Sequence, residues 1–222
     1  MARTAPEAAA PDWAQTAEQQ VLDAALKIVA HEGWTSRLAT LAGKACGLSA
    51  GETELLLPHG AADLAALLSR RHDAAALAAL AAVDPSALKI RERIARGVEA
   101  RVAAAAADEA AVRRLTGFLA LPSNLSLGAR LAWESADALW RWAGDTATDE
   151  NHYSKRALLA GILMATLLVR LSQGQAAAEA TLDRRIEAVM AFERFKGRVG
   201  KLRLGSWAAG AAGRLRYGLR AP

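Results

Sequence analysis

Apolar residues recur three or four positions apart along most of the 222-residue chain, and this spacing restricts the fold to helices. The clearest stripe is formed by Val21, Leu22, Ala25, Ile28 and Val29. Alanine is abundant throughout, and Ala and Leu are the strongest helix formers. No run of β-branched and aromatic residues alternates with polar residues as a strand would. The pattern predicts a single all-α domain.

Glycine and proline divide the chain into about nine to ten expected helices with short connections. The first is expected to end near Gly33. The others are expected at about 37–46, 49–57, 61–83, 87–106, 109–120, 124–142, 152–172, 177–196 and 201–219. Thr35 or Ser36 can cap the second helix, Ser49 can cap the third, and Pro58 stops it. We therefore divide the chain into a disordered tail (1–12), a helix-turn-helix module (13–60) forming one domain with a helical bundle (61–196), and a basic tail (197–222).

The net charge of +5 is concentrated at one end of the chain. From Lys196 onward there are seven Lys and Arg residues and no acidic residue, which leaves 21 basic against 23 acidic residues before it. The basic tail therefore predicts an anionic partner, either a membrane or a nucleic acid.

The sequence favours a soluble or peripheral protein. Cys46 is the only cysteine, which excludes an internal disulfide, fits a reducing compartment and is interpreted as a small buried hydrophobe. The first residues lack an apolar core of signal-peptide length. The most apolar stretch, 157–169, lies between Arg156 and Arg170; thirteen residues are too few to span a bilayer, so we interpret it as a buried helix.

Residues 34–64 resemble the N-terminal module of TetR-family regulators, in which two short helices joined by a glycine turn follow a longer helix. The frame of that module is kept by Gly47, Ser49, Gly51 and Pro58. The exposed reading positions are expected to be filled by Glu52, Thr53, Glu54 and Leu55. Affinity for DNA comes largely from basic residues that release counterions from the phosphates, and two carboxylates reverse that contribution. We therefore expect no specific DNA binding, and a module kept as a folding unit.

The segment 118–199 carries the most distinctive sequence. It contains Leu121-Pro122, Asp137-x-x-Trp140, Gly144-Asp145, Thr148-Asp149, Asn151, Tyr153, Lys155-Arg156 and Leu182–Ile186. This text, with the Gly33-Trp34-Thr35 turn, resembles the Coq-nine family of ubiquinone-biosynthesis accessory proteins, a lipid-binding family built on the TetR fold. The chain departs from many members at Ala147, Glu150 and His152, where they have Ser, an aromatic residue and Trp.

The resemblance implies three functional surfaces. The first is an internal pocket for an isoprenoid quinone lipid, for which the candidate residues are Phe118, Leu119, Leu125, Trp140, Leu158, Ile162, Leu163 and Met190. The second is a docking patch for the demethoxyubiquinone hydroxylase, with the candidates Asp149, Asn151, His152, Tyr153, Lys155 and Arg156. Each apolar candidate is also a natural core residue, and acids before a helix are also natural caps, so both readings stay open.

The third surface is a C-terminal amphipathic helix on the membrane, where the family also carries one. The pattern of Arg, Trp and Leu is typical of a helix lying among lipid headgroups, although five glycines weaken it in water. Its candidate membrane contacts are Leu204, Trp207, Leu215, Leu219, Arg203 and Arg214. The other interpretation is a disordered solubilising tail.

No reaction centre is evident in the sequence. The four histidines lack metal-ligand spacing, there is no Glu-x-x-His pair and no phosphate-binding glycine loop. We expect a non-enzymatic protein without metal or cofactor that presents a polyprenylated quinone intermediate to the hydroxylase. The alternative is a ligand-responsive TetR-type transcription regulator. The expected location is cytoplasmic and peripheral on the inner membrane in a bacterium, or the matrix side of that membrane in a mitochondrion. A homodimer is expected because proteins of the TetR fold, which the chain resembles, commonly dimerise through the last two helices of the bundle.

Overall fold

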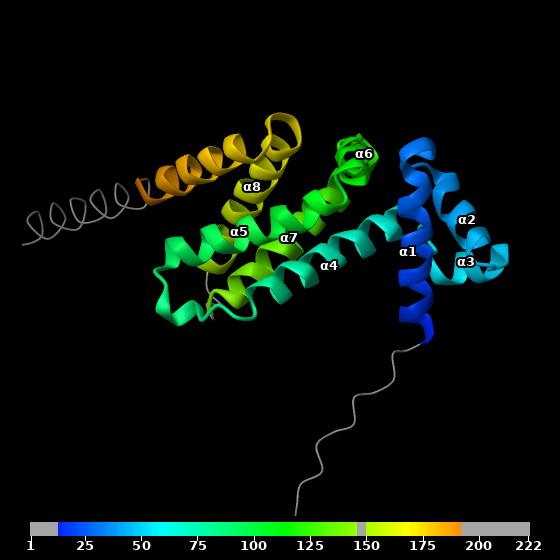
Figure 1. Cartoon of the computed structure of the whole chain (residues 1–222), viewed down its shortest axis with the longest axis horizontal. Coiled ribbons are helices and arrows are strands. Elements are labelled where there is room, and N and C mark those ends of the chain that lie inside the picture. The colour runs from blue at the N-terminus through cyan, green and yellow to red at the C-terminus, as the bar shows by residue number, and fades with distance from the viewer. Residues whose placement is uncertain (1–12, 146–149, 192–222) are drawn as a thin grey trace, which may run out of the picture.

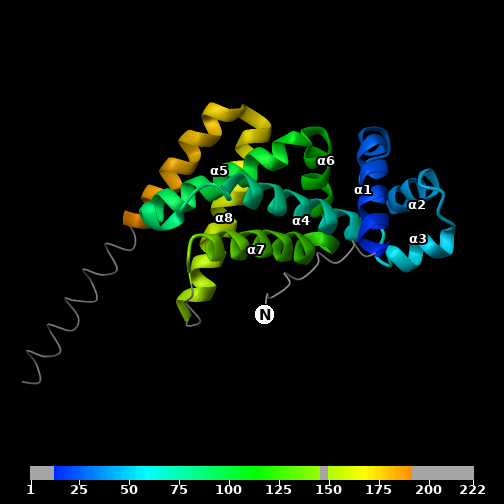
Figure 2. The same ribbon diagram turned by 60° about the horizontal axis from the view of Figure 1, so that its bottom comes forward.

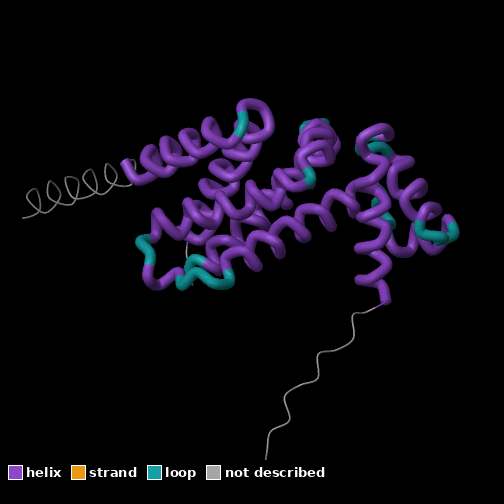
Figure 3. The backbone as a smooth tube through the Cα atoms, in the orientation of Figure 1, coloured by secondary structure: helices purple, strands orange, loops and turns teal. Residues whose placement is uncertain are grey.

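A computed structural model describes residues 13–145 and 150–191, and side chains of 150–152 are not described. In this part of the chain all regular structure is helical, joined by short loops (Figure 3). The elements are α1 (Trp13–Glu32), α2 (Ser36–Ala45), α3 (Ala50–Leu56), α4 (Ala61–Leu80), η1 (Pro85–Ala87), α5 (Ile90–Ala107), α6 (Glu109–Leu119), η2 (Pro122–Asn124), α7 (Leu125–Trp142), α8 (Glu150–Gln173) and an unlabelled helix over 175–191. The all-α prediction is confirmed. The expected disordered tail at 1–12 and the expected helix at 201–219 lie outside the described residues.

The helices form an N-terminal module and a bundle, with α4 running from one to the other. In Figures 1 and 2, α1, α2 and α3 lie together at one end, while α5, α7 and α8 gather at the other. The most extensive packing joins α4 with α5, α1 with α2, and α7 with α8. The stripe predicted on α1 is buried at Val21, Leu22, Ala25 and Val29, because it faces the module's own core.

The α2–α3 turn has the geometry of a helix-turn-helix. Gly47 has a φ of 78°, a conformation that residues with a Cβ adopt at a cost. Ser49 caps α3: its hydroxyl accepts from the Glu52 backbone N–H at 3.2 Å, and the Glu52 carboxylate accepts from the Ser49 N–H at 2.8 Å. The Ser49 hydroxyl also donates to the Glu52 carboxylate at 2.7 Å, and this hydrogen bond, together with the one from the Ser49 N–H, lowers the pKa of Glu52. Glu52 therefore has a structural role at the start of α3 in addition to its charge.

Two expectations for the module are wrong in detail. Thr53 is 6% exposed and packs against Gly43 of α2, whereas Glu52, Glu54 and Leu55 are exposed as predicted. The helical spacing of the sequence is the same whether Thr53 faces α2 or the solvent. Only the packing of α3 against α2 shows that it is buried. Thr35 occupies the N-cap position of α2, but its side chain makes no capping hydrogen bond. Cys46 is partly buried at the edge of the core.

The module is fastened to the bundle through Trp34. Its indole Nε1–H donates to the backbone oxygen of Ala111 in α6 at 3.0 Å, and its ring lies 6.3 Å from that of Phe118. A buried indole needs such a partner for its N–H. These contacts and α4 make the module and the bundle one continuous core.

The thirteen-residue apolar stretch 157–169 lies within α8, a helix of 24 residues. Tyr153–Gln173 of α8 is long and apolar enough to cross a bilayer by length and composition alone. Leu159, Ile162, Leu163, Leu167 and Leu171 of this helix are buried in the bundle, as a core helix requires. The interpretation as a core helix accounts for these residues without a membrane.

Candidate lipid-binding site

An apolar cavity of about 310 Å³ lies where the start of α5, the end of α7, the first half of α8 and the 175–191 helix meet. We call it the α5–α8 cavity. Its apolar lining consists of Ile90, Ile94, Trp140, Leu158, Leu159, Ile162, Ile186, Val189 and Met190. The volume is at the lower end of the roughly 300–1,000 Å³ typical of small-molecule sites, which are mostly apolar with a few placed polar groups.

An ion-pair network fixes α7 against α8 behind this cavity. The Arg156 side chain is 2% exposed, its Nε lies 2.5 Å from Asp137 Oδ1, and its Nη1 lies 3.2 Å from Asp145 Oδ2. Arg141 also pairs with Asp137 on α7. A buried guanidinium is tolerated only when it is paired and hydrogen-bonded, and both conditions are met here. These ion pairs connect α8 to α7 through Asp137 and to the segment after α7 through Asp145.

Asp145 is the acid shared by two cations. Its side chain is 7% exposed and lies 2.7 Å from Lys155 Nζ. Burial by itself raises the pKa of Asp145, but hydrogen bonds and charge from Lys155 and Arg156 outweigh burial, so the pKa is lowered. Asp145 is consequently ionised throughout the neutral range.

Trp140 connects this network to the cavity wall. Its Nε1–H donates to the backbone oxygen of Lys155 at 3.1 Å, and Lys155 Nζ lies 5.4 Å from the ring centroid. Both contacts hold the indole in one orientation, and a cation over an aromatic face is itself attractive. The rigid ring forms one side of the α5–α8 cavity.

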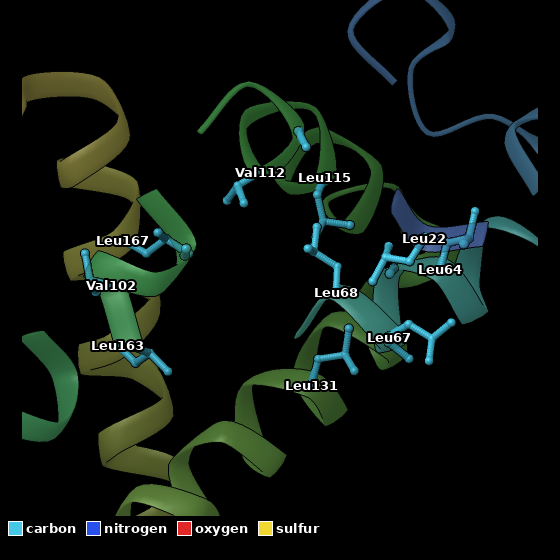
Figure 4. Close-up of a cluster of buried hydrophobic side chains, with 14 of the residues drawn as sticks. Leu22, Leu64, Leu67, Leu68, Val102, Val112, Leu115, Leu131, Leu163 and Leu167 are labelled. Carbon is cyan, nitrogen blue, oxygen red and sulfur yellow. The ribbon is translucent and has the colours of Figure 1, made fainter. Parts of the chain in front are cut away.

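The structure brings together half of the residues predicted to bind lipid. Trp140, Leu158, Ile162 and Met190 line the α5–α8 cavity. Leu119 and Leu163 line a second, internal cavity of about 50 Å³, around which Figure 4 shows Val112, Leu115, Leu131, Leu163 and Leu167. Phe118 packs beside Trp34, and Leu125 is 56% exposed at the start of α7, so neither lines the α5–α8 cavity.

Sequence reasoning missed the contribution of α5. Ile90 and Ile94 are four residues apart and therefore share one face of that helix, which was the available signal. Nothing in the local pattern tells which distant helix this face meets.

The internal cavity has a polar wall. Arg101, 7% exposed, pairs with Asp73 at 2.5 Å and donates to the Ser69 hydroxyl at 3.2 Å. His72 lies beside it, with Nε2 2.8 Å from Asp108 Oδ2. Burial lowers the pKa of His72 despite this hydrogen bond, so the imidazole is neutral and donates to the carboxylate. These groups bind α4 to α5 and to the start of α6.

The residues predicted to dock a partner lie in different environments. Tyr153 is 66% exposed, and its ring lies 6.0 Å from that of Trp133 on α7. Lys155 is about a third exposed, whereas Arg156 is buried in the network described above. Asp149 and the side chains of Asn151 and His152 lie outside the described residues, as do all six predicted membrane contacts in 203–219.

Within the described ranges, no group of three or more His, Cys, Asp or Glu side chains could hold a metal ion. In the described residues, the fold is an all-α bundle with an apolar cavity at the end away from the helix-turn-helix. Residues 125–193 match the COQ9 family model, and this match confirms the resemblance inferred from the sequence.

Curated relatives agree with the family match. The chain is 30% identical over 187 residues to the mitochondrial ubiquinone biosynthesis protein COQ9-A of Xenopus laevis. This alignment covers 78% of this chain and 57% of that protein. The chain is 28% identical over 184 residues to COQ9 of Rattus norvegicus and 27% identical over 184 residues to COQ9 of Homo sapiens. These alignments cover 78% of this chain and 58% and 57% of the relatives, so the chain spans somewhat more than half their length.

Proposed function

We propose that this chain is a non-enzymatic accessory protein of ubiquinone biosynthesis that holds the isoprenoid part of a polyprenylated quinone intermediate in the α5–α8 cavity. The observation that carries the proposal is the position of this cavity: nine of its twelve lining residues lie within the segment that matches the COQ9 family. The relatives are named as ubiquinone biosynthesis proteins, and ubiquinone intermediates carry an isoprenoid chain.

The apolar walls of the cavity favour binding of such a ligand by removing its isoprenoid chain from water. Each methylene removed from water contributes about 0.8 kcal/mol, so a few isoprene units bound among Ile94, Ile162 and Val189 give useful affinity. The fixed Trp140 ring adds a large apolar surface without the entropy cost of ordering it.

Presentation of the bound lipid is the second part of the proposal. The exposed Tyr153 and the partly exposed Lys155 flank the cavity on α8, where an aromatic and a cationic side chain suit a protein interface. The partner is the demethoxyubiquinone hydroxylase. The basic segment 201–220 holds the protein at the membrane from which the lipid is taken.

A matched pair of leucines on α8 tests the ligand assignment. Leu158 lines the cavity and is 45% exposed, whereas Leu168 is 48% exposed and lines neither cavity described above. We expect Leu158→Glu to reduce the isoprenoid quinone that co-purifies with the protein at least about tenfold, because the carboxylate makes the cavity polar. Leu168→Glu retains the lipid.

Mass spectrometry of lipid extracted from the purified proteins measures the difference. An equal lipid content in both variants contradicts the assignment, as does a wild-type protein that consistently carries no lipid.

The helix-turn-helix geometry favours one competing function, a ligand-responsive transcription regulator. Glu54 and Leu55 on the exposed side of α3 oppose it, since they offer the phosphates no positive charge. A sequence-specific, salt-sensitive gel shift with the full chain would establish that competing function.

A further inference from the structure

The lining of the α5–α8 cavity changes along α8 from exposed and polar to buried and apolar. The Lys155 side chain is 37% exposed and Leu158 is 45% exposed, whereas Leu159 and Ile162 are 1% and 7% exposed. Lys155 and Ile162 lie two turns apart on one face of the helix, which is a rise of about 10 Å. The cavity therefore has a rim at Lys155 and an apolar floor at Ile162.

The Lys155 ammonium group keeps donors that the protein does not use. An ammonium group has three N–H donors and no acceptor. One is directed to Asp145 Oδ1 at 2.7 Å, and Nζ lies 5.4 Å from the centroid of the Trp140 ring. Among the described side chains no other polar partner contacts this ammonium group. Because Asp145 already pairs with it, Lys155 offers a ligand a hydrogen bond, which an uncharged acceptor oxygen is able to accept.

Arg91, the other cation of the lining, is less suited to bind a ligand in the cavity. It also lines an open groove with Glu92, Asp183 and Glu187, and these three carboxylates compete with a ligand for its guanidinium. The lining therefore favours Lys155 as the donor to a ligand.

We propose that Lys155 donates a hydrogen bond to a carbonyl oxygen of the quinone ring and holds that ring at the rim, while the isoprenoid chain extends towards Ile162. The cavity then selects amphiphiles whose uncharged head carries acceptor oxygens over those whose head is a hydrocarbon. This inference rests on the lipid-binding function proposed above and adds the orientation of the ligand. Lys155 is two residues from the exposed Tyr153, so the ring is accessible at the surface where we place the hydroxylase.

Two lipids with one tail separate the contribution of the ring oxygens from that of the chain. Geranyl-1,4-benzoquinone and geranylbenzene are both uncharged and differ in the carbonyl oxygens. An equimolar mixture is added to the delipidated full chain, unbound lipid is removed by gel filtration, and bound lipid is quantified by mass spectrometry. We expect the ratio of bound quinone to bound hydrocarbon to be about tenfold lower in Lys155→Met than in the wild type, the effect of losing one hydrogen bond from a charged donor.

Two further variants distinguish direct donation from a general effect of charge. Lys155→Arg keeps a cationic donor at the rim and is expected to retain most of the preference for the quinone. Lys44→Met removes an exposed lysine of α2, at the other end of the molecule, and retains all of it. Because the ratio compares two ligands on the same protein, a loss of stability in one variant does not by itself change the ratio.

The outcomes distinguish a failure of lipid binding from a failure of head recognition. If the wild type retains neither lipid, the proposed lipid-binding function fails. If it retains lipid and Lys155→Met has the same ratio as the wild type, only the role of Lys155 fails. A fall in the ratio for Lys155→Arg or Lys44→Met as large as that for Lys155→Met also overturns this role. The hydroxylase is absent from the measurement, so the docking role proposed for Lys155 does not affect the result.

Discussion

At Gly43, α2 and α3 come closer than a side chain at this position permits. A Cβ built there would lie 2.1 Å from Thr53 Oγ1 and 2.7 Å from its Cγ2. We expect Gly43→Ala to destabilise the protein, because an overpacking cost of about 1–3 kcal/mol exceeds the roughly 1 kcal/mol that alanine gains in a helix. Urea unfolding measures the free energy of unfolding.

Gly51 of α3 provides the control for this substitution. A Cβ at Gly51 meets no atom within 4 Å, so Gly51→Ala is expected to stabilise the helix slightly. A Gly43→Ala protein as stable as the wild type would show that the two helices separate without cost.

His72 links stability to pH at the scale of one side chain. Its pKa in the folded protein is lowered from 6.5 by burial, so below pH 6.5 the unfolded chain takes up a proton more readily than the folded protein does. The contribution of His72 to the free energy of unfolding is therefore greatest above pH 6.5. It decreases as the pH falls from 6.5 towards the pKa of His72 in the folded protein.

The decrease is measured by urea unfolding between pH 7.5 and 5. We expect His72→Gln, which keeps a donor for Asp108, to have a smaller decrease than the wild type. Parallel pH curves for the two proteins would show that other groups cause the dependence.

Among the elements, α7 and α8 depend on a single buried cation. We expect Arg156→Gln to lower the free energy of unfolding by about 3–5 kcal/mol, because it leaves Asp137 and Asp145 buried with fewer partners. Arg130→Gln, which breaks a 4.0 Å surface pair with Glu134 on α7, is expected to cost less than about 1 kcal/mol. Thermal unfolding compares them, and equal losses would contradict a special role for Arg156.

The bounds of most elements could be predicted because their signals are local. Ser49 and Pro58 delimit α3 in the sequence as they do in space. The environment of Arg156 could not be predicted, since its two acids lie 19 and 11 residues away and meet it only through the α7–α8 packing. For the same reason the sequence identified Trp140 and Met190 as candidate ligand contacts but not Ile90, which approaches them from another helix.

For the whole molecule, the proposed docking surface and the helix-turn-helix lie at opposite ends (Figure 1). We expect Tyr153→Ala to weaken binding of the hydroxylase at least about tenfold, the effect of losing an exposed aromatic hot spot, with only a small fall in melting temperature from the lost contact with Trp133. Leu55→Ala, at the other end and 79% exposed, leaves that binding unchanged. Surface plasmon resonance with immobilised hydroxylase measures both, and equal affinities for all three proteins would refute docking at α8.

The fastening of Trp34 to α6 also bears on how such a scaffold can change over generations. The inner face of the N-terminal module is committed to folding through Trp34, Leu38 and Ala42, which are buried in the shared core. Residues on the outer face do not pack in this core, so substitutions at Glu54 or Leu55 are expected to change the free energy of unfolding very little. The module can therefore be retained for folding whatever residues occupy its exposed face, so its shape alone is no evidence of what that face binds.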